Sequence, residues 1–155
     1  MDPLTSVVTF LSVLLSNEFI FFAVVGAMVI FTEKRKEKRV KIILAIVLAS
    51  ALVIGLKTFF AEPRPCENTV GLVACPSLPF SNYSFPSGHA TIAFLLMLAF
   101  IDKPSFPFFW LFAFFVAYSR IFLGVHTFED IAGALVLAPI AYYLTDLLWV
   151  KFYGK

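Results

Sequence analysis

Residues 83–100 read YSFPSGHATIAFLLMLAF, a polar start followed by a largely apolar run of helical length. The apolar part is typical of a helix in a bilayer or a protein core. The Pro-Ser-Gly-His start is unusual in that setting, because polar groups are costly to place in a membrane. It also contains His89, one of only two histidines in the chain. The fold and the function both depend on what surrounds this stretch.

The composition indicates a membrane protein. The chain has 155 residues, of which 61% are hydrophobic and 14% are charged, whereas soluble domains average about 45–50% and about 25%. The net charge is only +2, and no basic stripe is interleaved with aromatic residues, which argues against nucleic acid as a partner. We therefore predict a single integral-membrane domain over residues 1–155.

The apolar segments predict an all-α, multi-pass helix bundle. Five spanning helices are expected, at residues 19–31, 40–60, 86–101, 105–120 and 128–150. Residues 4–15 mix Ser and Thr with apolar residues and are short for a span, so we expect an interfacial or re-entrant helix there, or else a sixth short span. Ser16-Asn17-Glu18 is expected to cap the first spanning helix. Residues 61–85 contain several prolines and both cysteines, which predicts an external loop.

The basic residues predict the orientation. The segment TEKRKEKRVK, residues 32–41, supplies six Lys and Arg, and Lys103, Lys151 and Lys155 fall on the same side. These nine of the twelve basic residues indicate the cytoplasmic side, because cytoplasmic loops carry an excess of Lys and Arg. Lys57, Arg64 and Arg120 fall near the external ends of spans, as do both histidines. Basic residues on the disfavoured side of a membrane require a functional reason.

Three spaced motifs collect these residues. Lys57, six residues, Arg64 and Pro65 close the second span; Pro86-Ser87-Gly88-His89 opens the third; and Ser119-Arg120, five residues, His126, three residues and Asp130 link the last two. Each motif alone is at least as often structural as catalytic. Together they place every basic and imidazole group of one membrane face in three motifs, which indicates one site.

The chemistry of the motifs favours a phosphate ligand. Pro86 suits the first turn of a helix, and the next three amides, of Ser87, Gly88 and His89, are then unpaired donors at the positive end of the helix dipole. Arginine and lysine neutralise phosphoryl oxygens. A carboxylate four residues after His126 can hold one ring nitrogen and leave the other free as a nucleophile or base.

The chain resembles the type 2 phosphatidic acid phosphatase superfamily, integral-membrane lipid phosphatases related to soluble acid phosphatases and vanadium haloperoxidases. Its K-x6-RP, PSGH and SR-x5-H-x3-D motifs match at every fixed position between Lys57 and Asp130. The resemblance implies a metal-independent mechanism without a cofactor. It implies that His126 attacks phosphorus with Asp130 orienting it, and that His89 protonates the leaving oxygen and later activates water. It also implies a phosphate-binding set, which comprises Lys57, Arg64, Ser87, Gly88 and Arg120.

The remaining alternatives concern the class of site and the substrate. A channel or transporter with a polar external vestibule predicts polar groups through the whole bilayer, and a metal site would need Cys66, Cys75, His89 and His126 at an atypical zinc spacing. We instead expect Cys66 and Cys75 to form a disulfide in an external loop. The leading substrate is a polyprenyl (undecaprenyl or dolichyl) diphosphate, and phosphatidate or phosphatidylglycerophosphate is the runner-up. The expected localisation is the cell membrane, with the active site on the extracytoplasmic face; the sequence does not indicate an oligomeric state.

Overall fold

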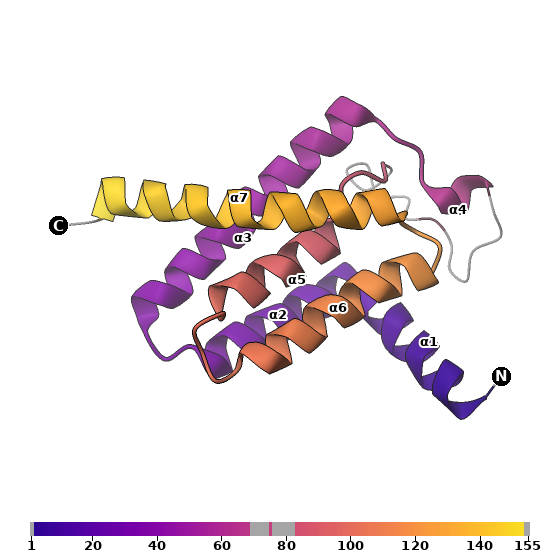
Figure 1. Cartoon of the computed structure of the whole chain (residues 1–155), viewed down its shortest axis with the longest axis horizontal. Coiled ribbons are helices and arrows are strands. Elements are labelled where there is room, and N and C mark those ends of the chain that lie inside the picture. The colour runs from indigo at the N-terminus through magenta and orange to yellow at the C-terminus, as the bar shows by residue number, and fades with distance from the viewer. Residues whose placement is uncertain (1, 69–74, 76–82, 154–155) are drawn as a thin grey trace.

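The computed structural model describes residues 2–68, 75 and 83–153, and this part of the chain is helical (Figure 1). Its helices are α1 (Pro3–Ser16), α2 (Glu18–Thr32), α3 (Lys36–Phe60), α4 (Pro65–Asn68), α5 (Gly88–Ala99), α6 (Phe106–Phe122) and α7 (Phe128–Tyr153). Between the described residues, β pairing is limited to one isolated bridge, Pro63 with Tyr83. The predicted all-α fold is therefore confirmed for this part of the chain.

Helix length limits the number of membrane spans that the structure establishes. Among the described helices, α3 with 25 residues and α7 with 26 are long and apolar enough to cross a membrane. α1 and α2 together form a third candidate, bent by 91° where they meet. Asn17 lies at this break and caps α2, as expected, by accepting a hydrogen bond from the Ile20 amide at 3.2 Å. Length and composition thus support two spans, or three with the bent pair, and five or six are not established.

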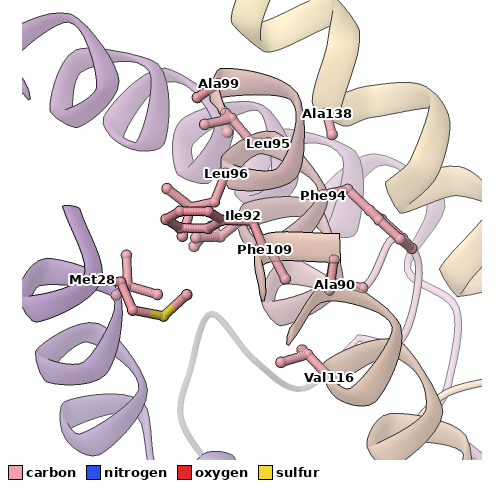
Figure 2. Packing of buried hydrophobic residues seen from close by; sticks show 14 of the residues in the cluster. Met28, Ala90, Ile92, Phe94, Leu95, Leu96, Ala99, Phe109, Val116 and Ala138 are labelled. Carbon is pink, nitrogen blue, oxygen red and sulfur yellow. The ribbon is translucent and has the colours of Figure 1, made fainter. Parts of the chain in front are cut away.

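α5 is the core helix of the bundle. Its 12 residues rise about 18 Å, well short of the roughly 30 Å hydrocarbon core of a bilayer. It packs against α3, α6 and α7, and Figure 2 shows its apolar side chains surrounded by neighbouring helices, with Met28 and Phe109 nearby. Because protein rather than lipid surrounds most of α5, its polar start lies inside the bundle.

Small residues allow the helices of the core to approach closely. Fully buried alanines lie on α5 and on two helices that pack against it, α3 and α7. They are Ala45 and Ala49 in α3, Ala90 and Ala93 in α5, and Ala134, Ala138 and Ala141 in α7. Small side chains of this kind are typical of helix crossings in membrane proteins. At the end of α5, the Phe100 and Phe109 rings stack with their centroids 4.0 Å apart, which packs the end of α5 against α6.

The basic segment at residues 33–41 is shorter as a loop than we predicted. α3 already begins at Lys36, because Lys, Arg and Glu are good helix formers and do not end a helix. Glu33, which is buried, lies 3.4 Å from Arg35, 3.9 Å from Lys38 and 3.6 Å from Lys103. The α2–α3 and α5–α6 connections therefore meet at one end of the bundle.

The predicted external loop is described at its two ends and at Cys75. Cys66 in α4 and Cys75 are joined by a disulfide, with their Cα atoms 5.7 Å apart. The rest of the cysteine-containing segment, residues 69–74 and 76–82, lies outside the described residues.

Candidate active site

The turn after α6 brings His126 into the bundle. α6 ends at Phe122, and Gly124 adopts a left-handed conformation with φ of 71°, which glycine tolerates without a steric cost. The Gly124 amide donates to the Ile121 carbonyl at 2.9 Å, and the Val125 amide donates to the Arg120 carbonyl at 3.2 Å. This turn reverses the chain, and His126 is buried as a result.

Asp130 both caps α7 and holds His126. The Thr127 amide donates to Asp130 Oδ2 at 2.8 Å, and the Asp130 amide donates back to Thr127 Oγ1 at 3.3 Å, a reciprocal arrangement of the capping-box kind. The same Oδ2 lies 3.0 Å from His126 Nδ1. The expected pair is therefore made, although α7 begins at Phe128 and His126 precedes the helix.

Arg64 fixes the tautomer of His126. Its Nη1 lies 3.2 Å from His126 Nε2 and also donates to the Val125 carbonyl at 3.0 Å. A guanidinium group has no acceptor, so Nε2 must carry the lone pair and Nδ1 must carry the proton that is donated to Asp130. Burial, with the charges of Arg64 and Lys57, outweighs Asp130 and lowers the pKa of His126 from 6.5 to about 4. The imidazole is thus neutral near pH 7.

Ser84 is a site residue that the sequence analysis missed. It is fully buried, its Oγ donates to Asp130 Oδ2, and its carbonyl accepts from Lys57 Nζ at 2.8 Å. Lys57 also donates to the Tyr83 carbonyl. Ser84 therefore connects the first motif to the third. No sequence pattern separates it from the nearby Ser77 and Ser81, so no signal was available to find it.

The start of α5 differs from the prediction in two details. Pro86 does not open the helix, because Ser87 is the N-cap and Gly88 is the first helical residue. The Ser87 amide is not an open donor, since it donates to the Asp130 carbonyl at 3.2 Å. The amides of Gly88 and His89 make no hydrogen bond within the described part of the chain. Two donors therefore remain at this helix start, instead of three.

Three buried polar atoms of the motif residues have no hydrogen-bond partner among the described residues. They are Ser87 Oγ, His89 Nε2 and Asp130 Oδ1. Buried polar atoms are nearly always hydrogen-bonded in folded proteins. Two of these orphaned atoms belong to Ser87 and His89 at the start of α5, so this region is suited to a polar ligand that supplies the missing partners.

The N-terminal helices support two other predicted site residues. Arg120 donates from Nη2 to the Ser12 carbonyl of α1 at 3.1 Å, and from Nε to Ser119 Oγ at 3.1 Å. The His89 ring lies 4.4 Å from the Phe21 ring of α2. The sequence analysis gave α1 and α2 no part in the site, because contacts between distant segments leave no local pattern.

The buried charges at this end are predominantly positive. Among the described residues, Lys57, Arg64, Arg120 and Asp130 are its buried ionised side chains, and their charges sum to +2 with His126 neutral. This excess suits an anion such as a phosphate. No group of three His, Cys, Asp or Glu side chains in the described part of the chain is placed to hold a metal ion. The disulfide also removes the two thiols that the metal hypothesis required.

The chain belongs to the PAP2 superfamily. Residues 38–152 match the sequence pattern of that family, and the matched region includes all three motifs. The predicted family is thus confirmed. Within the described residues, α3 and α7 are long and apolar enough to cross a membrane, which supports an integral-membrane protein.

Two curated relatives match at similar levels. The chain is 29% identical over 118 residues to the putative undecaprenyl-diphosphatase YbjG of Escherichia coli, a match that covers 73% of this chain and 59% of that protein. It is also 29% identical over 118 residues to human sphingosine-1-phosphate phosphatase 2, covering 68% of this chain and 29% of that protein. The chain therefore spans less than two thirds of the length of either relative.

Solved structures share the fold over nearly the whole chain. LpxE from Aquifex aeolicus superimposes with a TM-score of 0.69 at 30% identity, covering 95% of this chain and 88% of LpxE. A transmembrane PAP2-type phosphatidylglycerolphosphate phosphatase from Bacillus subtilis gives a TM-score of 0.64, covering 98% of this chain and 80% of that one. At 23% identity, the second comparison concerns the fold alone.

Proposed function

We propose that the protein is a membrane lipid phosphatase that transfers a phosphoryl group to His126 and then to water, without a metal ion. The observation that carries the proposal is the position of His126 between two fixed partners. Asp130 holds Nδ1 at 3.0 Å, and Arg64 lies 3.2 Å from Nε2. A neutral imidazole with an oriented lone pair and an adjacent cation is suited to attack phosphorus.

In the first step, His126 Nε2 attacks the terminal phosphorus while the bond from that phosphorus to the leaving oxygen breaks; in a diphosphate this is the bridging oxygen, which leaves with the lipid monophosphate. Arg64 bonds the phosphoryl oxygens in place of the Nε2 lone pair, which is then free to react. Lys57, Arg120, Ser87 Oγ and the amides of Gly88 and His89 supply further positive charge and donors, which matter because phosphoryl transfer depends mainly on positioning and charge stabilisation. The protonated form of His89 gives its proton to the leaving oxygen.

In the second step, water replaces His126 on phosphorus. His89, now neutral, accepts a proton from the attacking water, and the bond between phosphorus and Nε2 breaks. The products are inorganic phosphate and free His126. Asp130 stabilises the imidazolium character that develops while phosphorus is bound, as the orienting carboxylate does in hydrolytic triads. The three buried atoms without partners are accounted for if a phosphate and a water occupy the site.

A polyprenyl diphosphate is the substrate class that we propose. Both curated relatives have names that specify phosphorylated lipids, and the E. coli relative is named as a putative undecaprenyl-diphosphatase. Exposed Phe59 and Phe60 lie at the end of α3 beside the buried Lys57 and give an apolar tail a surface next to the phosphate site. Phosphatidate and phosphatidylglycerophosphate offer a similar combination of phosphate and tail, and they are the competing substrates in the test below.

The channel alternative is disfavoured by the distribution of buried polar residues. In the described residues of α5, the segment from Ile92 to Leu96 is buried and wholly apolar. Polar groups gather at the start of this helix instead of running along it. A site at one end of the bundle fits hydrolysis at a membrane surface better than passage through the membrane.

We further propose that α2, α3, α5, α6 and α7 all cross the membrane, with the active site on the extracytoplasmic face. α5 is shorter than a bilayer is thick, but it is enclosed by other helices and does not need to match the lipid. α6 has exposed aromatic side chains, and its 17 residues lie at the lower end of the usual length of a span. The loops that contain Glu33 and Lys103 meet at the end of the bundle away from His126. Most basic residues lie at this end, and cytoplasmic loops carry an excess of Lys and Arg, so we assign this end to the cytoplasm.

Phosphate release from a panel of lipids tests the proposal. Purified protein in detergent micelles is given undecaprenyl diphosphate, phosphatidate and phosphatidylglycerophosphate, with and without EDTA, and His126→Ala serves as the inactive control. We expect the diphosphate to be hydrolysed fastest, EDTA to have no effect, and His126→Ala to release no phosphate from any lipid. Faster hydrolysis of phosphatidate overturns the substrate assignment. Loss of activity in EDTA, restored by Mg²⁺, overturns the metal-free mechanism.

A further inference from the structure

A charged cavity lies at the opposite end of the bundle from the candidate active site. Its volume is about 330 Å³, and it is lined by Arg35, Glu37, Lys38, Lys41, Tyr142 and Trp149. It therefore lies between the start of α3 and the second half of α7, two helices that cross in Figure 1. Lys41 and Lys57 are 16 residues apart on α3, which is about 24 Å along the helix. The cavity is thus separate from the phosphate site.

The lining of this cavity favours an anion. Three of its side chains are basic and one is acidic, so their charges sum to +2. Glu33, which is outside the lining, pairs with Arg35 and Lys38 but also with Lys103, so the positive excess remains. Lys41 forms an ion pair with Asp146, and its ammonium group lies 5.8 Å from the Tyr142 ring. Arg35 is the N-cap of α3 and makes no side-chain capping bond. Glu37 in the first turn offsets part of the positive end of the α3 dipole, so the attraction for an anion rests on the basic side chains.

The aromatic residues place the cavity at the depth of lipid headgroups. Tyr142 and Trp149 are half-buried, and such residues prefer the interface between the hydrocarbon and the water. Exposed apolar side chains continue from the cavity along both helices: Leu44 lies one turn beyond Lys41, and Leu148 lies beside Trp149. An occupant with a charged head and acyl chains meets both surfaces at once. The cavity has the size of a small ligand site, which suits a headgroup but not a whole lipid.

We propose that this cavity binds the headgroup phosphate of an anionic phospholipid in the leaflet opposite the active site. Basic pockets between transmembrane helices are a recurrent way to hold such headgroups. Its lining has no histidine of the kind that the proposed phosphoryl transfer uses, so we assign it a binding role. A lipid bound there bridges α3 and α7, the helices that carry Lys57 and Asp130, and it stabilises their crossing through its binding free energy.

Quenching of Trp149 fluorescence tests the proposal without any need for turnover. The chain has two tryptophans, so Trp110→Phe leaves Trp149 as the sole reporter. The protein in phosphatidylcholine nanodiscs receives increasing fractions of brominated phosphatidylglycerol or, separately, of brominated phosphatidylcholine. We expect half-maximal quenching at a fraction of the anionic lipid that is at least about fivefold lower, since each basic residue near a membrane surface contributes about 1 kcal/mol, or about fivefold.

Matched charge variants distinguish a site from a merely basic surface. Lys38→Gln/Lys41→Gln removes two lining charges, whereas Lys34→Gln/Lys36→Gln removes two exposed charges that do not line the cavity. We expect only the first pair to abolish the preference for phosphatidylglycerol, with size-exclusion profiles and phosphate release confirming that both proteins are folded. An equal loss in both pairs overturns the proposal. Reversal of quenching by millimolar inorganic phosphate assigns the cavity to a soluble anion and also overturns it.

Discussion

At the scale of single residues, Asp130 organises the candidate site. Its Oδ2 accepts hydrogen bonds from Ser84 Oγ, His126 Nδ1 and the Thr127 amide. One oxygen therefore holds the start of α7, the loop before α5 and the His126 ring in place together. The other oxygen, Oδ1, is buried without a partner among the described residues. Because Oδ2 takes all of these donors, any displacement of Asp130 also displaces His126.

The pKa of His126 gives the first prediction. Burial and the charges of Arg64 and Lys57 lower this pKa to about 4, against 6.5 for a free imidazole. A lowered pKa means that the neutral form persists down to about pH 4 and that protonation occurs only below it. The unfolded chain binds the same proton near pH 6.5, so the free energy of unfolding should fall as the pH drops from 6.5 to 4.

NMR titration of the histidine ring carbons measures this pKa directly. The chain has only two histidines, and His89→Gln assigns the two signals. We expect the His126 signal to titrate near pH 4 in the free protein. A midpoint near 6.5 would show that His126 is exposed to solvent and is not held as described.

At the scale of elements, Gly133 sets the distance between α7 and the loop before α5. A Cβ atom built on Gly133 would lie 2.4 Å from Cε2 of Phe85, closer than side chains approach in proteins. Phe85 adjoins Ser84 and also packs edge-on against Phe60 of α3 at 5.1 Å. The absence of a side chain at Gly133 thus allows this loop to reach the site.

Substitution of Gly133 gives the second prediction. Gly133→Ala should cost about 1–3 kcal/mol of stability through overpacking, and it should reduce phosphate release by displacing Ser84. Gly55→Ala is the matched control, because a Cβ there meets nothing within 4 Å. The measurements are thermal unfolding and phosphate release in detergent. Adding Phe85→Leu to Gly133→Ala should recover part of the lost stability and part of the lost phosphate release. Equal stability and equal phosphate release of Gly133→Ala and Gly55→Ala would contradict this role for Gly133.

The sequence predicted the elements better than their ends. Hydropathy located five apolar helices, α2, α3, α5, α6 and α7, since apolar runs have few other structures available to them in a membrane. The predicted starts of α3 and α5 were wrong. The charged residues after Lys36 form helix readily, so α3 begins earlier than predicted. Pro86 precedes the N-cap Ser87 instead of opening α5, so α5 begins later. The motifs identified His126, Asp130 and Arg64, whose contacts the structure describes. Ser84, Ser12 and Phe21 were missed because their contacts join segments far apart in the chain.

At the scale of the whole molecule, the bundle has two chemically different ends. One end holds buried Lys57, Arg64, Arg120, His126 and Asp130. The other joins Glu33 to Lys38 and Lys103 and pairs Lys41 with Asp146. Most basic residues therefore lie at the end away from the candidate active site, which is the distribution that the predicted orientation requires.

Accessibility labelling tests this orientation and gives the third prediction. Lys36→Cys and Asn68→Cys are made singly in a Cys66→Ser/Cys75→Ser background, and intact cells are treated with a membrane-impermeant maleimide. We expect a cysteine at position 68 to react from outside and one at position 36 to react only after permeabilisation. Labelling of position 36 in intact cells would place the candidate active site on the cytoplasmic face.

The central claim is that His126 becomes phosphorylated, and a chemical trap tests it most directly. The wild-type protein, His89→Ala, His126→Ala and the double variant are mixed with a polyprenyl diphosphate that is radiolabelled in its terminal phosphate, and the protein is then denatured and analysed. His89→Ala removes the group that activates water, and general acid–base assistance is worth about 10²–10⁴-fold. The lipid monophosphate can still leave without a proton.

We predict that His89→Ala accumulates an acid-labile, base-stable phosphohistidine at position 126, and that His126→Ala and the double variant carry no label. Label on His89 in the His126→Ala protein would contradict this account, as would phosphate release by His126→Ala at the rate of the wild-type protein.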